Sequence, residues 1–118
     1  MANAALFIGW NRAVAGREAQ ALELFYTANQ FWAQQQTEGR IEGFEQILLN
    51  PHAGDLNGFT IIRGDRNKLN TLKDSNDFQD LLVRAAFLLE GVGCVDAHVG
   101  ESVMTQAQRY GKTVQSAK

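Results

Sequence analysis

The stretch that decides the fold is Arg40–Asp65, with the sequence RIEGFEQILLNPHAGDLNGFTIIRGD. Apolar and polar residues nearly alternate over 40–50 and again over 58–65, which is typical of β-strands. The link between them, residues 50–57, holds the single proline of the chain together with glycine, aspartate and two asparagines. That composition is typical of turns, so the stretch predicts a β-hairpin.

Both faces of the predicted hairpin carry large apolar side chains. Alternation places Ile47 and Leu49 with Glu45 on one face, and Phe44 and Leu48 with Gln46 on the other. A sheet with one face in water shows a cleaner separation of apolar and polar residues. We therefore expect helices to cover one face and a second copy of the chain to cover the other. If Phe44 and Leu48 lie in that contact, replacing either with aspartate is expected to separate the dimer.

The flanking segments predict one helix before the hairpin and one after it, with a strand at each end. The expected elements are a strand at Ala4–Asn11, a helix at Arg17–Gln36, a short helical turn near Asn67–Lys73, a helix from Ser75 or Asn76 to Glu90, and a strand at Gly93–Val103. This β-α-β-β-α-β order predicts an α+β, ferredoxin-like fold. It has a four-stranded antiparallel sheet with both helices on one face.

We expect a single domain over residues 1–118, with a core at about 4–104 and a polar tail at 105–118. The tail is expected to be loose, with at most a short helix near Gln106–Tyr110. In the last strand Val95, Ala97 and Val99 alternate with Cys94, Asp96 and His98. If the three apolar residues face the helices, Asp96 and His98 face the second copy.

Composition indicates an ordinary globular protein: 118 residues, 45% apolar, 20% charged, with a net charge of −2. The near-neutral charge and the absence of Lys/Arg clusters argue against a nucleic-acid surface. The N-terminus has neither the basic region of a signal peptide nor an apolar run long enough for a membrane span. With one cysteine, Cys94, no internal disulfide can form, and we expect a cytoplasmic location.

No metal or cofactor is expected. The chain has two histidines and one cysteine without ligand spacing between them. Gly91-Val92-Gly93 lacks the third glycine and the strand–turn–helix context of a dinucleotide loop.

Three local patterns give the chain a resemblance to a known superfamily. They are Glu42-Gly43-Phe44-Glu45, then Asn76-Asp77-Phe78 before Leu81-Leu82, and Gly93–Gly100 running into Glu101-Ser102-Val103. Together with the element order, over residues 4–104, they resemble the dimeric α+β barrel superfamily, which includes the antibiotic-biosynthesis-monooxygenase-like proteins. The resemblance implies a homodimer paired sheet to sheet, with small molecules held between sheet and helices or inside the barrel.

The resemblance also implies site residues. In monooxygenase-like members an Asn on the first strand and a Trp elsewhere can position substrate and oxygen without a cofactor. Asn11 would fill the first role here, and Trp10 or Trp32 the second, with core packing as the favoured alternative for both tryptophans. Haem-degrading members need a histidine late in the second helix; residues 77–90 contain none, which argues against that activity.

His98 beside Asp96 is a candidate acid–base pair, because an imidazole near a carboxylate can transfer protons near neutral pH. A hydrogen-bonded interface histidine is the favoured alternative. Glu45 and Arg63 could form a cross-strand ion pair or hold a polar ligand.

The sequence thus predicts a small-molecule-binding homodimer, with a cofactor-independent, monooxygenase-like activity as one form of it. The expected catalytic residues are Asn11, Asp96 and His98. The expected ligand contacts are Trp10, Trp32, Phe44, Gln46 and Arg63. The alternative is a non-enzymatic assembly protein that acts through its oligomer, and the sequence leaves open whether the protein is an enzyme.

Overall fold

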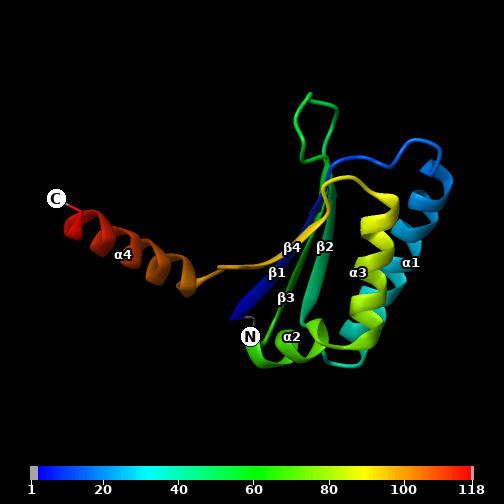
Figure 1. Ribbon diagram of the computed structural model, residues 1–118. Helices are drawn as coiled ribbons and strands as arrows, with labels where there is room; N and C mark the ends of the chain where they lie inside the picture. Colours follow the sequence, from blue (N-terminus) through cyan, green and yellow to red (C-terminus); the bar gives the residue numbers. More distant parts are fainter. Residues whose placement is uncertain (1–2, 118) are drawn as a thin grey trace.

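The computed structural model describes residues 3–117 and builds them around one four-stranded antiparallel sheet (Figure 1). The strands are β1 at Ala4–Trp10, β2 at Gly43–Leu48, β3 at Gly58–Gly64 and β4 at Gly93–Ala97. Their spatial order is β2-β3-β1-β4, so β1 and β3 are central and the two others are edges. The predicted hairpin and the α+β, antiparallel architecture are confirmed. Residues 1, 2 and 118 of the predicted single domain lie outside the described part.

Helices α1 (Glu18–Thr37) and α3 (Asn76–Leu88) lie on the same side of the sheet in Figure 1, and the short α2 (Arg66–Lys73) lies at one end. The starts of α2 and α3 follow ordinary capping chemistry. Ser75 Oγ accepts a hydrogen bond from the Phe78 N–H at 3.2 Å, and Asp65 accepts one from the Lys68 N–H at 3.1 Å. The sequence prediction missed that 66–73 forms two full turns of helix.

The core lies between the sheet and these helices. In the hairpin, Phe44 pairs with Ile62, which in turn pairs with Leu6 of β1, so all three side chains lie on the helix side. The buried core residues are Ala4, Leu6, Ile8, Trp32, Ile41, Ile62, Leu69, Leu72 and Phe78. Phe44 packs against this cluster. Its predicted place in a contact with a second copy is therefore wrong, because that contact needs the other face.

The facing of β4 is the reverse of the prediction. Leu6 pairs with Asp96, which puts the Asp96 side chain on the helix side, while Val95 and Ala97 lie on the opposite side. The reason is α2: Lys73 Nζ and Arg66 Nη1 lie 3.2 and 3.5 Å from Asp96 Oδ1. Alternation defines the two faces of a strand but not which of them meets the helices. Here Lys73 and Arg66, at the end of the sheet, pair with Asp96 on the helix side.

The end of the chain also differs from the prediction. β4 stops at Ala97, Gly100 adopts a positive φ of 58°, and helix α4 runs over Glu101–Ser116. The Ser102 hydroxyl accepts a hydrogen bond from the Val99 N–H at 3.0 Å and so fixes the turn before the helix. The expected strand to Val103 and loose tail are therefore replaced by a turn and a 16-residue helix.

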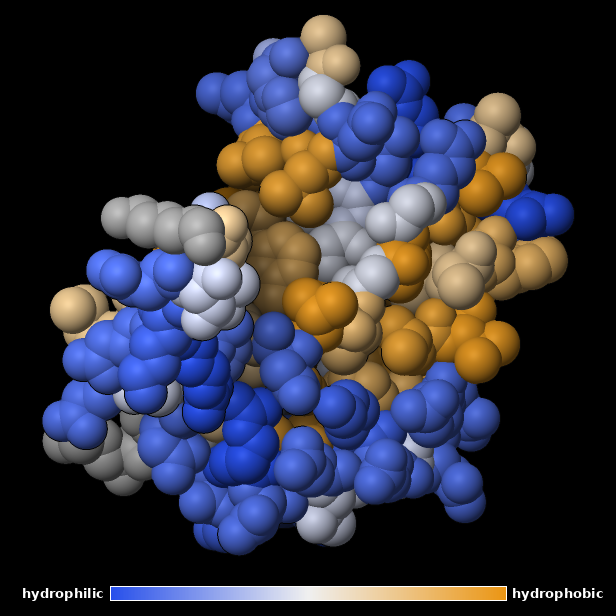
Figure 2. All heavy atoms as spheres, turned by 60° about the vertical axis from the view of Figure 1, so that its left-hand side comes forward, coloured by the Kyte–Doolittle hydropathy of each residue, from blue (hydrophilic) through white to orange (hydrophobic). Residues whose placement is uncertain are grey.

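The sheet face away from α1 and α3 has no cover in the described chain, and we call it the open face. Its apolar members are Phe7, Ile47, Phe59, Ile61 and Val95. Figure 2 shows apolar side chains gathered at the centre of this side of the molecule and continuing to the right-hand edge of the view, with hydrophilic residues above, below and to the left. The Phe7 and Phe59 rings stack with centroids 5.2 Å apart. The predicted Glu45–Arg63 pair is present on this face, at 3.4 Å and exposed.

No helix within residues 3–117 is long and apolar enough to cross a membrane.

Candidate functional site

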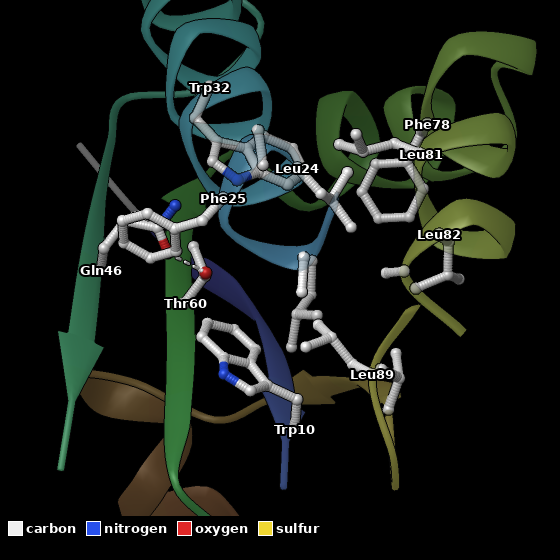
Figure 3. A pocket seen from close by; sticks show the side chains of 15 residues that line it. Trp10, Leu24, Phe25, Trp32, Gln46, Thr60, Phe78, Leu81, Leu82 and Leu89 are labelled. Atoms are coloured by element: carbon white, nitrogen blue, oxygen red, sulfur yellow. Dashed lines mark hydrogen bonds between the residues drawn. The ribbon is translucent and has the colours of Figure 1, made fainter. Parts of the chain in front are cut away.

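A pocket lies between the sheet and helices α1 and α3, and we call it the helix–sheet pocket (Figure 3). Its walls are almost entirely apolar. They are formed by Ile8, Trp10, Ala21, Leu24, Phe25, Ala28, Trp32, Gln46, Thr60, Phe78, Leu81, Leu82, Ala85, Leu89 and Val92. The volume open to water-sized molecules is about 80 Å³, several times the ~10–15 Å³ that one ordered water needs on such a measure. The pocket therefore has room for more than a single water.

Three neighbouring strands each contribute one polar side chain to this pocket. Gln46 on β2 and Thr60 on β3 are register partners, and the Thr60 hydroxyl donates a hydrogen bond to Gln46 Oε1. Thr60 is 3% exposed, so this bond satisfies a hydroxyl that would otherwise be costly to bury. Trp10, at the end of β1, adds its indole N–H, and Figure 3 shows the three side chains around the same space.

Two hydrogen-bond donors are left uncommitted at this place. Because Gln46 uses its carbonyl oxygen toward Thr60, its amide NH₂ is available. Within residues 3–117, neither Gln46 Nε2 nor Trp10 Nε1 has a hydrogen-bond acceptor among the protein atoms. No ionisable side chain in the described part of the chain lines the pocket. The site therefore offers donors and apolar contact to an uncharged molecule that carries an acceptor such as a carbonyl oxygen.

The two tryptophans have different surroundings. A Cβ atom on Gly58 would lie 2.7 Å from the Trp10 ring, so the missing side chain is what lets this indole lie flat on β3. Trp32 is only 2% exposed, and its ring meets Phe31 edge-on at 4.9 Å and Phe78 at 5.7 Å. Trp32 is thus a fixed wall of the pocket, while Trp10 lies closer to solvent.

Asn11 lies next to the pocket and does not line it. Its side-chain oxygen accepts a hydrogen bond from Asn57 Nδ2, and the Asn57 N–H donates to the Trp10 carbonyl at 2.9 Å. The Asn11 N–H donates to the Glu90 carbonyl at 2.8 Å. These bonds tie the hairpin loop and the end of α3 to the end of β1. Asn11 is therefore held in a network of hydrogen bonds next to Trp10.

Asp96 and His98 lie on another part of the molecule. Asp96 is engaged by Lys73 and Arg66 as described above, and His98 is exposed in the link between β4 and α4. Neither residue lines the helix–sheet pocket. The structure thus does not bring the three predicted catalytic residues together within one protomer.

Of the five predicted ligand contacts, Trp10, Trp32 and Gln46 line the same pocket, whereas Phe44 packs on the core and Arg63 lies on the open face. The sequence prediction missed Thr60 and Phe25. Thr60 could be found only from the hairpin register, because its partner Gln46 identifies the face on which it lies.

Cys94 lies on the helix side of β4 and is partly buried. Burial raises the pKa of its thiol, the Asp96 carboxylate raises it further, and Lys73 acts in the opposite direction. The thiol is therefore protonated at neutral pH and is a poor nucleophile. This environment argues for a packing role.

We expect iodoacetamide at pH 8 to alkylate Cys94 in the folded protein at least about tenfold more slowly than in the chain unfolded by guanidinium. Mass spectrometry of timed samples measures the two rates. Because the folded-state pKa is raised, this thiol should also stabilise the fold fully at neutral pH and lose that contribution as the pH rises through its folded pKa. Equal alkylation rates in the two states would contradict this assignment.

A second hollow, at the end of α1 beside α2, has a different character. It is lined by Arg40 and Lys68 together with Glu38 and Asp77. Glu38 is bound by Arg40 at 2.6 Å, and hydrogen bonding from Gln34 lowers its pKa. The positive and negative side chains of this hollow are thus at least partly paired with one another. Its surface is open and polar, unlike the enclosed and mostly apolar lining of a typical ligand pocket.

Among residues 3–117, no group of three or more His, Cys, Asp or Glu side chains could hold a metal ion.

Comparisons with known proteins agree with the geometry of the sheet and helices. No family model matches the chain, and no curated protein matches it in sequence. Among solved structures, a dimeric protein of unknown function and ferredoxin-like fold from Bacteroides fragilis has a TM-score of 0.62 at 10% identity, covering 81% of this chain and 95% of that one. The chain has the ferredoxin-like fold.

Two further structures share this ferredoxin-like fold. A dimeric ferredoxin-like protein of unknown function from Thermobifida fusca has a TM-score of 0.61 at 14% identity, covering 81% of this chain and 91% of that one. SnoaB, a cofactor-independent oxygenase from Streptomyces nogalater, has a TM-score of 0.52 at 18% identity, covering 84% of this chain and 97% of that one. At these identities the likeness concerns the fold, and function has to be argued from the site.

Proposed function

We propose that this protein binds an uncharged, largely apolar small molecule in the helix–sheet pocket. The observation that carries the proposal is the pair of uncommitted donors, Gln46 Nε2 and Trp10 Nε1, in walls that are otherwise apolar and uncharged. Apolar contact would supply most of the affinity, and either donor would fix the orientation of an acceptor oxygen on the ligand.

A monooxygenase-like reaction is the chemistry we propose to test in this pocket. Its support is the fold shared with SnoaB, a cofactor-independent oxygenase. Because no ionisable group among residues 3–117 lines the pocket, the substrate would have to be one that oxidises readily by itself, such as a quinol-type aromatic. Trp10 and Gln46 would orient it. Asn11, Asp96 and His98 stay candidates for catalysis, and alanine variants at each position, with oxygen uptake as the readout, test them.

We also propose that two copies pair through their open faces, so that the two sheets enclose a barrel-like interior. Phe7, Phe59 and Ile61 form an apolar patch in the centre of this face, and an apolar patch rimmed by polar residues is typical of a protein contact. The two similar structures described as dimeric, from B. fragilis and T. fusca, support a homodimer. A purely structural role through this dimer is the second candidate function, which the same open face supports.

Filling the pocket tests the binding proposal. Ala28 lines the pocket from α1, whereas Ala33, on the same helix, is exposed. We expect Ala28→Phe to weaken binding of aromatic ligands at least about tenfold by occupying their space, while Ala33→Phe leaves affinity within about twofold. Quenching of Trp10 and Trp32 fluorescence during titration with a panel of neutral aromatic ketones and quinols measures both.

The donor role has its own control. Gln46→Leu combined with Thr60→Val keeps the pocket apolar and removes the amide together with the hydroxyl that bonds it, so a ketone should lose about three- to tenfold in affinity while its hydrocarbon analogue binds as before. If no member of the panel quenches tryptophan fluorescence in the folded wild-type protein, the binding proposal fails and the structural role becomes the better account.

A further inference from the structure

Helix α4 has an apolar stripe that no residue of positions 3–117 in its own protomer covers. Val103, Ala107, Tyr110 and Val114 follow one another at spacings of four, three and four residues, which puts them on one side of the helix. Their exposure is high: 48% for Val103, 74% for Tyr110 and 47% for Val114. No described residue of α4 is buried. The opposite side carries Thr105, Gln108 and Lys112 and is polar.

Helix α4 is not expected to be stable in water without contacts to another surface. Isolated helices shorter than ~12–15 residues are marginal even when rich in alanine. α4 has 16 residues, includes Gly111, Thr105 and Thr113, and has Gly100 at its N-cap without a side-chain hydrogen bond. Packing of its apolar stripe against another surface would supply the missing stability.

The direction of α4 indicates where that surface lies. In Figure 1, α4 extends from the side of the sheet opposite α1 and α3, which is the side of the open face. The radius of gyration is 16.1 Å, against about 13.5 Å for an average compact domain of this length. The helix thus reaches into the space that a partner on the open face would occupy.

Interface area points to a second copy of the chain as that partner. Four short strands about 4.8 Å apart give an open face of roughly 400 Å², so two such faces would bury about 800 Å² in total, below the ~1,200–2,000 Å² of a stable interface. A helix of this length offers a side of roughly 240 Å², and two exchanged helices with the surfaces beneath them would add about 1,000 Å². Together, the paired sheet faces and the exchanged helices would bury an area within the range of a stable interface.

We propose that two copies of this chain exchange their α4 helices, each laying the Val103–Tyr110–Val114 stripe on the partner protomer beside the paired open faces. This inference rests on the sheet-to-sheet dimer proposed above. It does not depend on the helix–sheet pocket, which lies on the other face of each sheet.

Charge placed on the two sides of α4 tests the exchange. We expect Tyr110→Asp to raise the dimer dissociation constant more than about tenfold, because it buries a carboxylate in the contact, and Gln108→Asp on the polar side to change it less than about threefold. Analytical ultracentrifugation over a dilution series of the full-length protein measures both constants.

Hydrogen exchange on the wild-type chain separates the alternatives. Exchange in α4 should slow as protein concentration rises through the dissociation constant, while β1 stays protected throughout. Two results would overturn the exchange of α4 helices between protomers and leave the sheet-to-sheet contact standing. One is a dimer in which the amide hydrogens of α4 exchange freely with solvent. The other is a Tyr110→Asp variant with the same dimer dissociation constant as Gln108→Asp. Protection of α4 in a monomer would show the helix folding onto its own sheet and overturn both proposals.

Discussion

Ile61→Asp is expected to convert the protein from a dimer to a monomer. Ile61 lies on the central strand β3, on the open face, and pairs with Phe7 of β1. In a sheet-to-sheet contact each protomer would bury one unpaired carboxylate, and each such burial costs several kcal/mol. The dissociation constant should therefore rise at least about 100-fold. Light scattering after size-exclusion chromatography should return the 13.1 kDa mass of one chain.

The matched control is Leu22→Asp, which places the same charge on the exposed side of α1. Leu22 is 56% exposed and lies away from the open face, so its variant should remain dimeric. Circular dichroism should show both variants folded, because Ile61 is only partly buried within one protomer. A wild-type protein that runs as a monomer at micromolar concentration, or an Ile61→Asp variant that stays dimeric, would refute the sheet-to-sheet contact.

Phe78→Ala should lower the free energy of unfolding by about 3–5 kcal/mol, since it removes a large buried side chain and leaves a cavity. Phe78 is 1% exposed, begins the apolar side of α3, and packs against Trp32 with ring centroids 5.7 Å apart. A loss of this size is a large part of the total stability of a small domain. Chemical denaturation, followed by the fluorescence of the buried Trp32, measures it.

Phe87→Ala, on the same helix, is the control. Phe87 is 58% exposed, and the Arg17 guanidinium lies 4.0 Å from its ring centroid. Losing this contact should cost no more than about 1 kcal/mol. Similar denaturation midpoints for the Phe78 and Phe87 variants would mean that the core is not organised around Phe78 and Trp32.

The element order could be predicted from the sequence because its signals are local. Turn residues between Leu49 and Gly58 give the hairpin, the Ser75 cap marks the start of α3, and the uninterrupted 18–37 segment gives α1. The C-terminal helix was predicted only as a short helix near Gln106–Tyr110, for the opposite reason. Its apolar stripe is narrow and its composition polar, so its local signal is weak, and its stability has to come from packing.

The candidate site could be predicted only in part. Trp10, Trp32 and Gln46 were selected from the sequence, and the structure places all three around one pocket. Thr60 was missed and Phe44 misplaced, because both depend on which strand face meets the helices. The same uncertainty assigned Asp96 to the wrong side of the sheet, where Lys73 and Arg66 of α2 decide the outcome.

The ferredoxin-like element order and the two apolar sheet faces follow from local sequence patterns. Periodicity and turn chemistry are properties of neighbouring residues and can be recognised without knowing the fold. Which face forms the core, and that Gln46 and Thr60 are register partners, became known from the folded structure. It also showed that α4 projects from the open-face side. These facts depend on strand register and on contacts between residues far apart in the chain, and a one-residue shift in register would move every side chain to the other face.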